Sequence, residues 1–92
     1  MTETQRHRLE IVNEKGLHAR ASAKLAEVVE GYDATSVISK DGMTASGDSI
    51  MGLLMLAASK GTFIEVETSG TQADALAEAI AALVASRFGE DS

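Results

Sequence analysis

Two kinds of hydrophobic spacing alternate along this chain, and their order limits the folds that it can adopt. Alternating apolar residues or clustered β-branched residues predict strands with one wet face in four segments: residues 5–13, 35–40, 43–46 and 62–68. Helical spacing of apolar residues marks three others: residues 21–30, 50–59 and 71–88. Half-polar strands with tight turns pair antiparallel, and amphipathic helices bury their apolar sides against a sheet. We therefore expect an α+β two-layer sandwich in the order β-α-β-β-α-β-α, with a four-stranded antiparallel sheet and three helices on one face.

Glycines and polar caps predict where the helices begin and end. Gly31 should close the first helix and Gly61 the second, because glycine readily takes the conformations that terminate a helix. Residues 71–74 form a plausible capping box for the third helix, which Gly89 and the acidic tail should terminate. The inward stripe of that helix is expected to comprise Leu76, Ile80, Leu83, Val84 and Phe88.

Composition limits the partners and the chemistry. The chain has 92 residues, which suits a single domain over residues 1–92. A net charge of −6 argues against nucleic acid as a partner, because a phosphate backbone would be repelled. Two histidines and no cysteine leave too few soft ligands for a zinc or iron–sulfur site, so we expect no metal. Residues 1–8 are polar and predict neither a signal peptide nor membrane insertion, so we expect a cytoplasmic protein.

Two acidic features give no catalytic signal. Residues 42–49 nearly match a nucleotide-binding P-loop, but Asp48 stands where lysine is required and would repel the phosphates. We therefore expect no nucleotide and no other cofactor. Glu78 and the carboxylates of the tail after Gly89 have no partner at a spacing suited to acid–base catalysis, and solvated surface is predicted for them.

The junction between the first strand and the first helix carries the candidate chemistry. The sequence Gly16-Leu17-His18-Ala19-Arg20 places His18 at the N-terminus of the helix, where free backbone N–H groups and the helix dipole favour an anion. A neutral imidazole there has a free ring nitrogen that can attack phosphorus, and Arg20 can reach the phosphoryl oxygens. This spacing alone favours a simple capping or packing histidine, because isolated His-x-Arg triplets are common at helix starts.

The helix predicted at residues 50–59 is apolar nearly all round. Ser49 is expected to be its N-cap, and Leu53 and Leu56 are expected to face the core. The remaining large side chains would then form an exposed apolar patch: Ile50, Met51, Leu54 and Met55. Such a patch on a small domain favours a docking surface, although it could instead pack against a neighbouring helix or a second copy of the chain.

Two of these motifs together resemble a known family. Gly16-Leu17-His18-Ala19-Arg20 resembles the phosphorylation signature of HPr, the histidine-containing phosphocarrier of the bacterial phosphoenolpyruvate-dependent phosphotransferase system. Residues 48–56 resemble the regulatory serine of that family and the short helix that follows it, and Gly61-Thr62 comes at the expected distance. Ala21, in place of the proline usual in sugar-system HPr, and the run at residues 51–56 are most like the nitrogen-type branch, NPr. The HPr-like fold implies the sheet order 1-4-2-3.

The resemblance implies that His18 accepts a phosphoryl group on Nδ1 from phosphorylated enzyme I and passes it to an enzyme IIA-type protein. Arg20 and the backbone amides of Ala19 and Arg20 would stabilise the phosphoryl oxygens. The chain would then be a phosphoryl carrier rather than a stand-alone enzyme. The residues expected to dock against partners are Ala19, Arg20, Ser22, Ala23, Ile50, Met51, Leu54 and Met55.

Two regulatory interpretations remain open. Ser49 matches the serine that HPr kinase phosphorylates in Gram-positive relatives, although Asp48 replaces the lysine usual before it. The domain could also act mainly as a regulatory binding module, in nitrogen or stress regulation, whose His18 phosphorylation state selects its target proteins.

Overall fold

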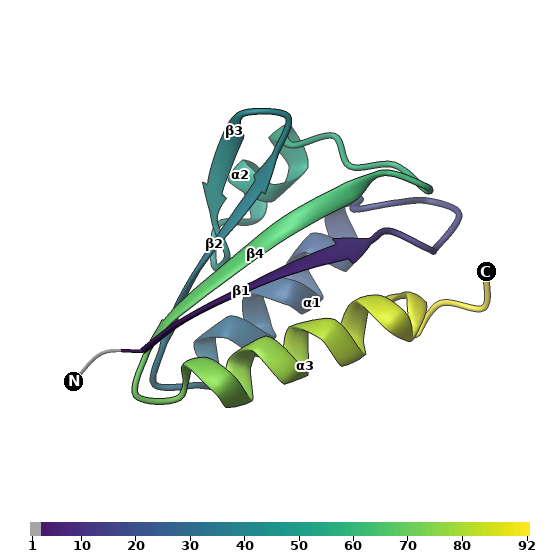
Figure 1. Ribbon diagram of the computed structural model, residues 1–92. Coiled ribbons are helices and arrows are strands. Elements are labelled where there is room, and N and C mark those ends of the chain that lie inside the picture. Colours follow the sequence, from purple (N-terminus) through teal and green to yellow (C-terminus); the bar gives the residue numbers. More distant parts are fainter. Residues whose placement is uncertain (1–2) are drawn as a thin grey trace.

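The computed structural model describes residues 3–92 and contains one sheet covered by helices on one face (Figure 1). Its elements in chain order are β1 (Glu3–Glu10), α1 (Ala19–Glu30), β2 (Thr35–Lys40), β3 (Met43–Ser46), α2 (Ile50–Met55), β4 (Phe63–Gly70), α3 (Ala73–Ala85) and the 3₁₀ helix η1 (Arg87–Gly89). The strands are all antiparallel, in the order β1-β4-β2-β3. The predicted fold class and sheet order are confirmed.

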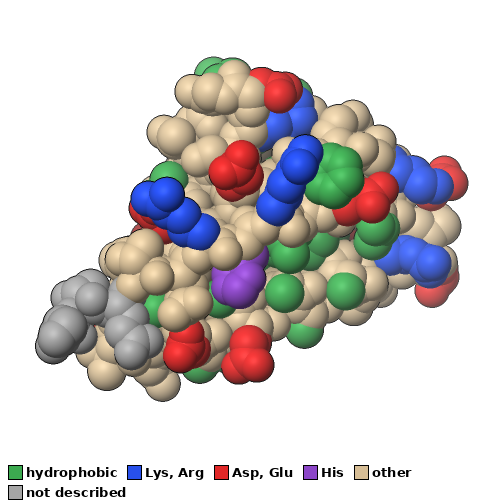
Figure 2. Space-filling view, in the orientation of Figure 1, with side chains coloured by type: hydrophobic (Ala, Val, Ile, Leu, Met, Phe, Trp, Pro, Cys, Tyr) green, Lys and Arg blue, Asp and Glu red, His purple; other side chains and the backbone are tan. Residues whose placement is uncertain are grey.

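Strand β4 lies inside the sheet and shows how the two faces differ. Every second side chain points into the core and is buried: Ile64, Val66 and Thr68. On the opposite face Phe63 is exposed, and the guanidinium of Arg8 lies 4.4 Å from the centre of its ring. Figure 2 shows acidic and basic side chains intermingled over the strands. This alternation gives the sheet one wet face and leaves the other to the helices.

The predicted ends of the first strand and the second helix were too late in the chain. Strand β1 stops at Glu10, and Asn13, expected to end it, is buried in the loop that follows. Helix α2 stops at Met55, because Ala57 adopts a left-handed conformation (φ 51°) that the helix cannot continue through. Gly61, predicted to close this helix, lies instead in the loop before β4.

Helix α3 begins and ends differently from the prediction. The capping box predicted at residues 71–74 is wrong: Gln72 is the N-cap, and among the described residues its side chain caps no helix N–H. Its Oε1 instead accepts a hydrogen bond from the Asp33 amide at 2.6 Å. The helix ends at Ala85, and Phe88, predicted to lie within it, is a fully buried residue of η1 with φ 55°. The other core residues of the stripe, Leu76, Ile80 and Val84, are buried as expected, and Leu83 is half-buried.

Close backbone contacts hold the loop between β1 and α1 against the segment between α2 and β4. The Leu17 amide donates to the Ala58 carbonyl at 2.8 Å, and the Gly61 amide donates to the Ile11 carbonyl at 2.8 Å. Gly16 has φ +66°, and a Cβ there would lie 2.5 Å from the Ala58 oxygen. Glycine is therefore required at this position, and the fold fixes the entry to α1. Within residues 3–92, no helix has the length and apolar character needed to cross a membrane.

Candidate functional site

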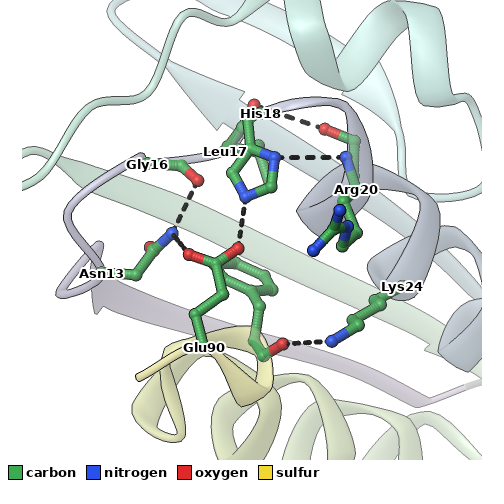
Figure 3. Close-up of polar contacts among 9 residues, drawn as sticks. Asn13, Gly16, Leu17, His18, Arg20, Lys24 and Glu90 are labelled. Atoms are coloured by element: carbon green, nitrogen blue, oxygen red, sulfur yellow. Dashed lines mark hydrogen bonds and ion pairs between the residues drawn. The ribbon is translucent and has the colours of Figure 1, made fainter. Parts of the chain in front are cut away.

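His18 is the N-cap of α1, as the sequence predicted (Figure 3). Its backbone is extended (φ −80°, ψ −176°), and its carbonyl accepts the Ser22 amide at 2.8 Å, the first hydrogen bond of the helix. Its side chain turns back so that Nδ1 accepts the Arg20 amide at 3.3 Å. The ring is about a quarter exposed, with 26% of its side-chain surface accessible. Nδ1 therefore lies at the positive end of the helix, in a half-open position.

The other ring nitrogen, Nε2, is hydrogen-bonded to the carboxylate of Glu90 in the C-terminal tail (Figure 3). Oε1 of the same carboxylate accepts a hydrogen bond from Asn13 Nδ2 at 3.0 Å, and Asn13 Nδ2 also donates to the Gly16 carbonyl at 2.8 Å. The hydrogen bond from His18, followed by that from Asn13, lowers the pKa of Glu90 from its ordinary value. Glu90 is thus an ionised acceptor at neutral pH.

These contacts assign the tautomer of His18. A carboxylate only accepts, so Nε2 carries the hydrogen, whereas Nδ1 faces a backbone N–H and must present its lone pair. The nitrogen at the helix N-terminus is therefore the one that carries a lone pair and no hydrogen. This is the atom that the family resemblance named.

Glu90 corrects the prediction that the tail carboxylates are solvated surface. Only 16% of its side chain is exposed. Two contacts hold the tail in place: Phe88 is fully buried, and Lys24 Nζ donates to the Phe88 carbonyl at 2.6 Å. Glu90 lies 72 positions from His18 in the sequence, so no local motif could have paired them. Lys24 was missed for the same reason.

Basic side chains surround the site on the α1 side. Arg20 and Lys24 are one helical turn apart and line a depression that also includes Lys15 and Glu90. Arg20 is exposed, so its guanidinium is free to move toward a ligand. Cationic donors close to a nucleophilic nitrogen suit an anionic group such as a phosphoryl.

The docking residues predicted from sequence fall into two groups. The first group is exposed or half-buried and comprises Ala19, Arg20, Ala23, Ile50, Met51, Leu54 and Met55. Met51 and Met55 are the most open, at 70% and 66% exposed. Ser22 is fully buried, with its Oγ directed at the Leu17 carbonyl at 3.4 Å, so its prediction as a docking residue is wrong. Leu53 and Leu56 are buried as expected, and α2 packs beside α1.

Comparison with known proteins decides the family. A family model described as the phosphorylation site of the HPr component of the phosphotransferase system (PTS) matches residues 5–86. The chain belongs to the HPr family. It is 43% identical over 82 residues to phosphocarrier protein HPr of Neisseria meningitidis, covering 89% of this chain and 92% of that protein. It is 42% identical over 89 residues to phosphocarrier protein NPr of Escherichia coli, covering 96% and 99%.

Solved HPr structures share the fold. HPr from Bacillus anthracis matches with a TM-score of 0.84 at 34% identity, covering 88% of this chain and 96% of that one. An HPr from Thermoanaerobacter tengcongensis matches with a TM-score of 0.91 at 28% identity, covering 96% and 99%. Family membership supports a phosphocarrier role in a PTS, and relatives named HPr and NPr match at comparable identity.

Ser49, the serine that resembles the regulatory residue of the HPr family, is the N-cap of α2. Its Oγ accepts the Gly52 amide at 3.1 Å, as a capping serine should. Capping alone explains this residue, and its phosphorylation by an HPr kinase stays a prediction.

Proposed function

We propose that His18 accepts a phosphoryl group from phosphorylated enzyme I and passes it to an enzyme IIA-type protein. The observation that carries this proposal is the unprotonated Nδ1 at the N-terminus of α1, with the hydrogen of the ring held on Nε2 by Glu90. The Nδ1 lone pair would form the bond to phosphorus as the bond from phosphorus to the donor breaks. No proton needs to leave the ring, because Nδ1 has none.

The groups around Nδ1 would stabilise the transferred phosphoryl. The Arg20 amide, which now donates to Nδ1, would turn to a phosphoryl oxygen once that lone pair is bonded. The Ala19 amide belongs to the same helix N-terminus, whose N–H groups lack intrahelical partners. The guanidinium of Arg20 would add a charged donor. Each of these groups would stabilise the negative charge of the bound phosphoryl.

The apolar face of α2 would provide the docking surface. Phosphoryl transfer requires the donor phosphorus and Nδ1 to meet in line, so a partner must seat close to His18. Met51 and Met55 are exposed on a helix that packs beside α1, and flexible methionines can adapt to more than one partner. Ala19 and Ala23 would continue this surface on α1 with small side chains.

Incubation with phosphoenolpyruvate and a phosphotransferase enzyme I tests the proposal. We expect one acid-labile phosphohistidine per chain, and none in His18→Ala. His7→Ala is the matched control, because His7 is the second histidine and lies exposed on β1. His7→Ala should label like the parent protein. Undiminished labelling of His18→Ala would contradict the assignment.

A second role follows from the position of the apolar patch. A phosphoryl on His18 would add negative charge close to a mostly apolar surface, which favours some partners and repels others. The domain could then act as a regulatory module in the cytoplasm that reports its phosphorylation state to target proteins. Affinity capture with the free and phosphorylated forms tests this role. Identical partners for both forms would exclude such a switch.

A further inference from the structure

The C-terminal tail carries a carboxylate to the ring of His18. Helix α3 has already ended at Ala85, and η1 turns the chain back toward α1 through residues with positive φ, among them Phe88 (φ 55°) and Gly89 (φ 78°). Positive φ at a large side chain such as Phe88 costs energy. Burial of the Phe88 ring and the Lys24 hydrogen bond hold the turn in this shape. This turn places the Glu90 carboxylate against Nε2 of His18.

We propose that Glu90 is a positioning residue for phosphoryl transfer: its carboxylate keeps the hydrogen of His18 on Nε2 both before and after Nδ1 binds phosphorus. This inference rests on the proposed function and names a group of the same site. Glu90 would touch the ring only at the nitrogen remote from the reaction, so it would act through His18. Asn13, which donates to the same carboxylate at 3.0 Å, would orient it.

The chemistry explains why an anion is useful at Nε2. When Nδ1 bonds to phosphorus with Nε2–H in place, the ring acquires positive charge, and Glu90 lies against that charge. When the phosphoryl moves on, the bond between Nδ1 and phosphorus breaks and its electron pair returns to Nδ1. With the hydrogen still on Nε2, the leaving group is neutral imidazole, whereas loss of that hydrogen would make it an imidazolate anion. Glu90 would therefore favour both uptake and release.

The position of the charge avoids a conflict with the phosphoryl. Glu90 contacts the nitrogen on the opposite side of the ring from Nδ1, so the ring separates the two anionic groups. Lys15, Arg20 and Lys24 line the depression in which the Glu90 carboxylate also lies. A phosphoryl on Nδ1 would therefore meet the Arg20 amide, whereas the Glu90 carboxylate meets Nε2 and Asn13.

NMR of the unphosphorylated protein tests the ring contact without any partner protein. In the parent protein, nitrogen-15 spectra should show a protonated Nε2 and an unprotonated Nδ1 in His18, with the Nε2 hydrogen protected from exchange and shifted downfield by the carboxylate. In Glu90→Gln this resonance should move upfield, because the neutral amide oxygen is a weaker acceptor. In Glu90→Ala it should be lost to solvent exchange. A hydrogen found on Nδ1 of the parent protein, or a resonance unchanged in both variants, would overturn the inference.

Kinetics of phosphoryl transfer from enzyme I test the consequence. Glu90→Ala should lower kcat by about tenfold, the lower end of the range for groups that orient a reactive histidine in metal sites, with little change in KM. Glu90→Gln should fall between this variant and the parent. Asp91→Asn is the matched control, because it removes the neighbouring carboxylate of the tail, which is exposed, and should match the parent in both measurements.

The two proposals fail in different ways. If the parent protein takes no phosphoryl from enzyme I, the proposed function is wrong, whatever the NMR spectra show. If the parent and Glu90→Gln transfer at the same rate, the charge of Glu90 has no part in the reaction and the inference is wrong, while the carrier function stands. Glu90→Gln is nearly isosteric with the parent residue, so its far-ultraviolet circular dichroism and thermal midpoint should show that both proteins fold alike.

Discussion

At the scale of single residues, the site depends on side chains and on one close backbone approach that only glycine allows. His18 supplies the ring, Glu90 and the Arg20 amide assign its two nitrogens, and Gly16 allows the loop to approach Ala58 closely. The sequence predicted His18, Arg20 and the helix N-terminus, because these lie within a few positions of one another. Glu90 could not be predicted, because its role depends on a contact made only in the folded chain.

Substitution of Gly16 by alanine should be costly. The new Cβ would lie 2.5 Å from the Ala58 oxygen and 2.9 Å from the Ser59 Cα, both backbone atoms that cannot move independently. The left-handed conformation adds about 1 kcal/mol, so the free energy of unfolding should fall by about 2–4 kcal/mol. Gly42→Ala is the control: Gly42 has φ +83°, but a Cβ there would meet nothing within 4 Å. Urea denaturation that gave equal losses for the two variants would contradict the crowding argument.

At the scale of elements, one side of helix α2 packs in the core and the other side is exposed. Leu53 is fully buried, whereas Met51 is 70% exposed on the same helix. The sequence predicted this division from helical spacing, and the structure confirms it. The end of the helix was mispredicted, because the apolar run continues past Met55 while the backbone turns left-handed at Ala57. Hydrophobic pattern identifies a face well and an end poorly.

Substitution on the exposed side of α2 should weaken docking and leave the free energy of unfolding nearly unchanged. Met51→Gln should change the free energy of unfolding by less than about 0.5 kcal/mol, because the side chain is largely in solvent already. If α2 docks the donor, the KM for phosphorylated enzyme I should rise severalfold with little change in kcat. Leu53→Ala is the comparison for the core side and should cost about 2–5 kcal/mol. Unchanged transfer kinetics in Met51→Gln would remove this residue from the docking surface.

At the scale of the whole molecule, the segment between β1 and α1 meets the C-terminal tail, which is distant from it in the sequence. Asn13 comes from the loop after β1, His18 from the start of α1, and Glu90 from the tail after η1. The fold class and strand order followed from the spacing of apolar residues and the family resemblance. The return of the tail did not follow, because Phe88 was predicted to be buried as part of α3, whereas it is buried in η1 within a left-handed turn that gives no periodic signal.

The Lys24 hydrogen bond should couple the tail to α1, and its removal should loosen both the tail and the ring contact. Lys24→Met keeps the aliphatic stem but loses the charged donor to the Phe88 carbonyl, a partly buried bond of 2.6 Å. Hydrogen bonds to charged groups contribute about 1.5–3 kcal/mol, so we expect a loss in this range and faster hydrogen exchange at the amides of Gly89 and Glu90. Lys60→Met is the matched control, because Lys60 pairs with Glu14 at 3.6 Å and both side chains are exposed. Exposed pairs contribute about 0–1 kcal/mol. If the two variants lost equal stability and tail exchange stayed slow in Lys24→Met, the coupling through Lys24 would be excluded. The buried Phe88 ring and the hydrogen bonds of Glu90 would then hold the tail without it.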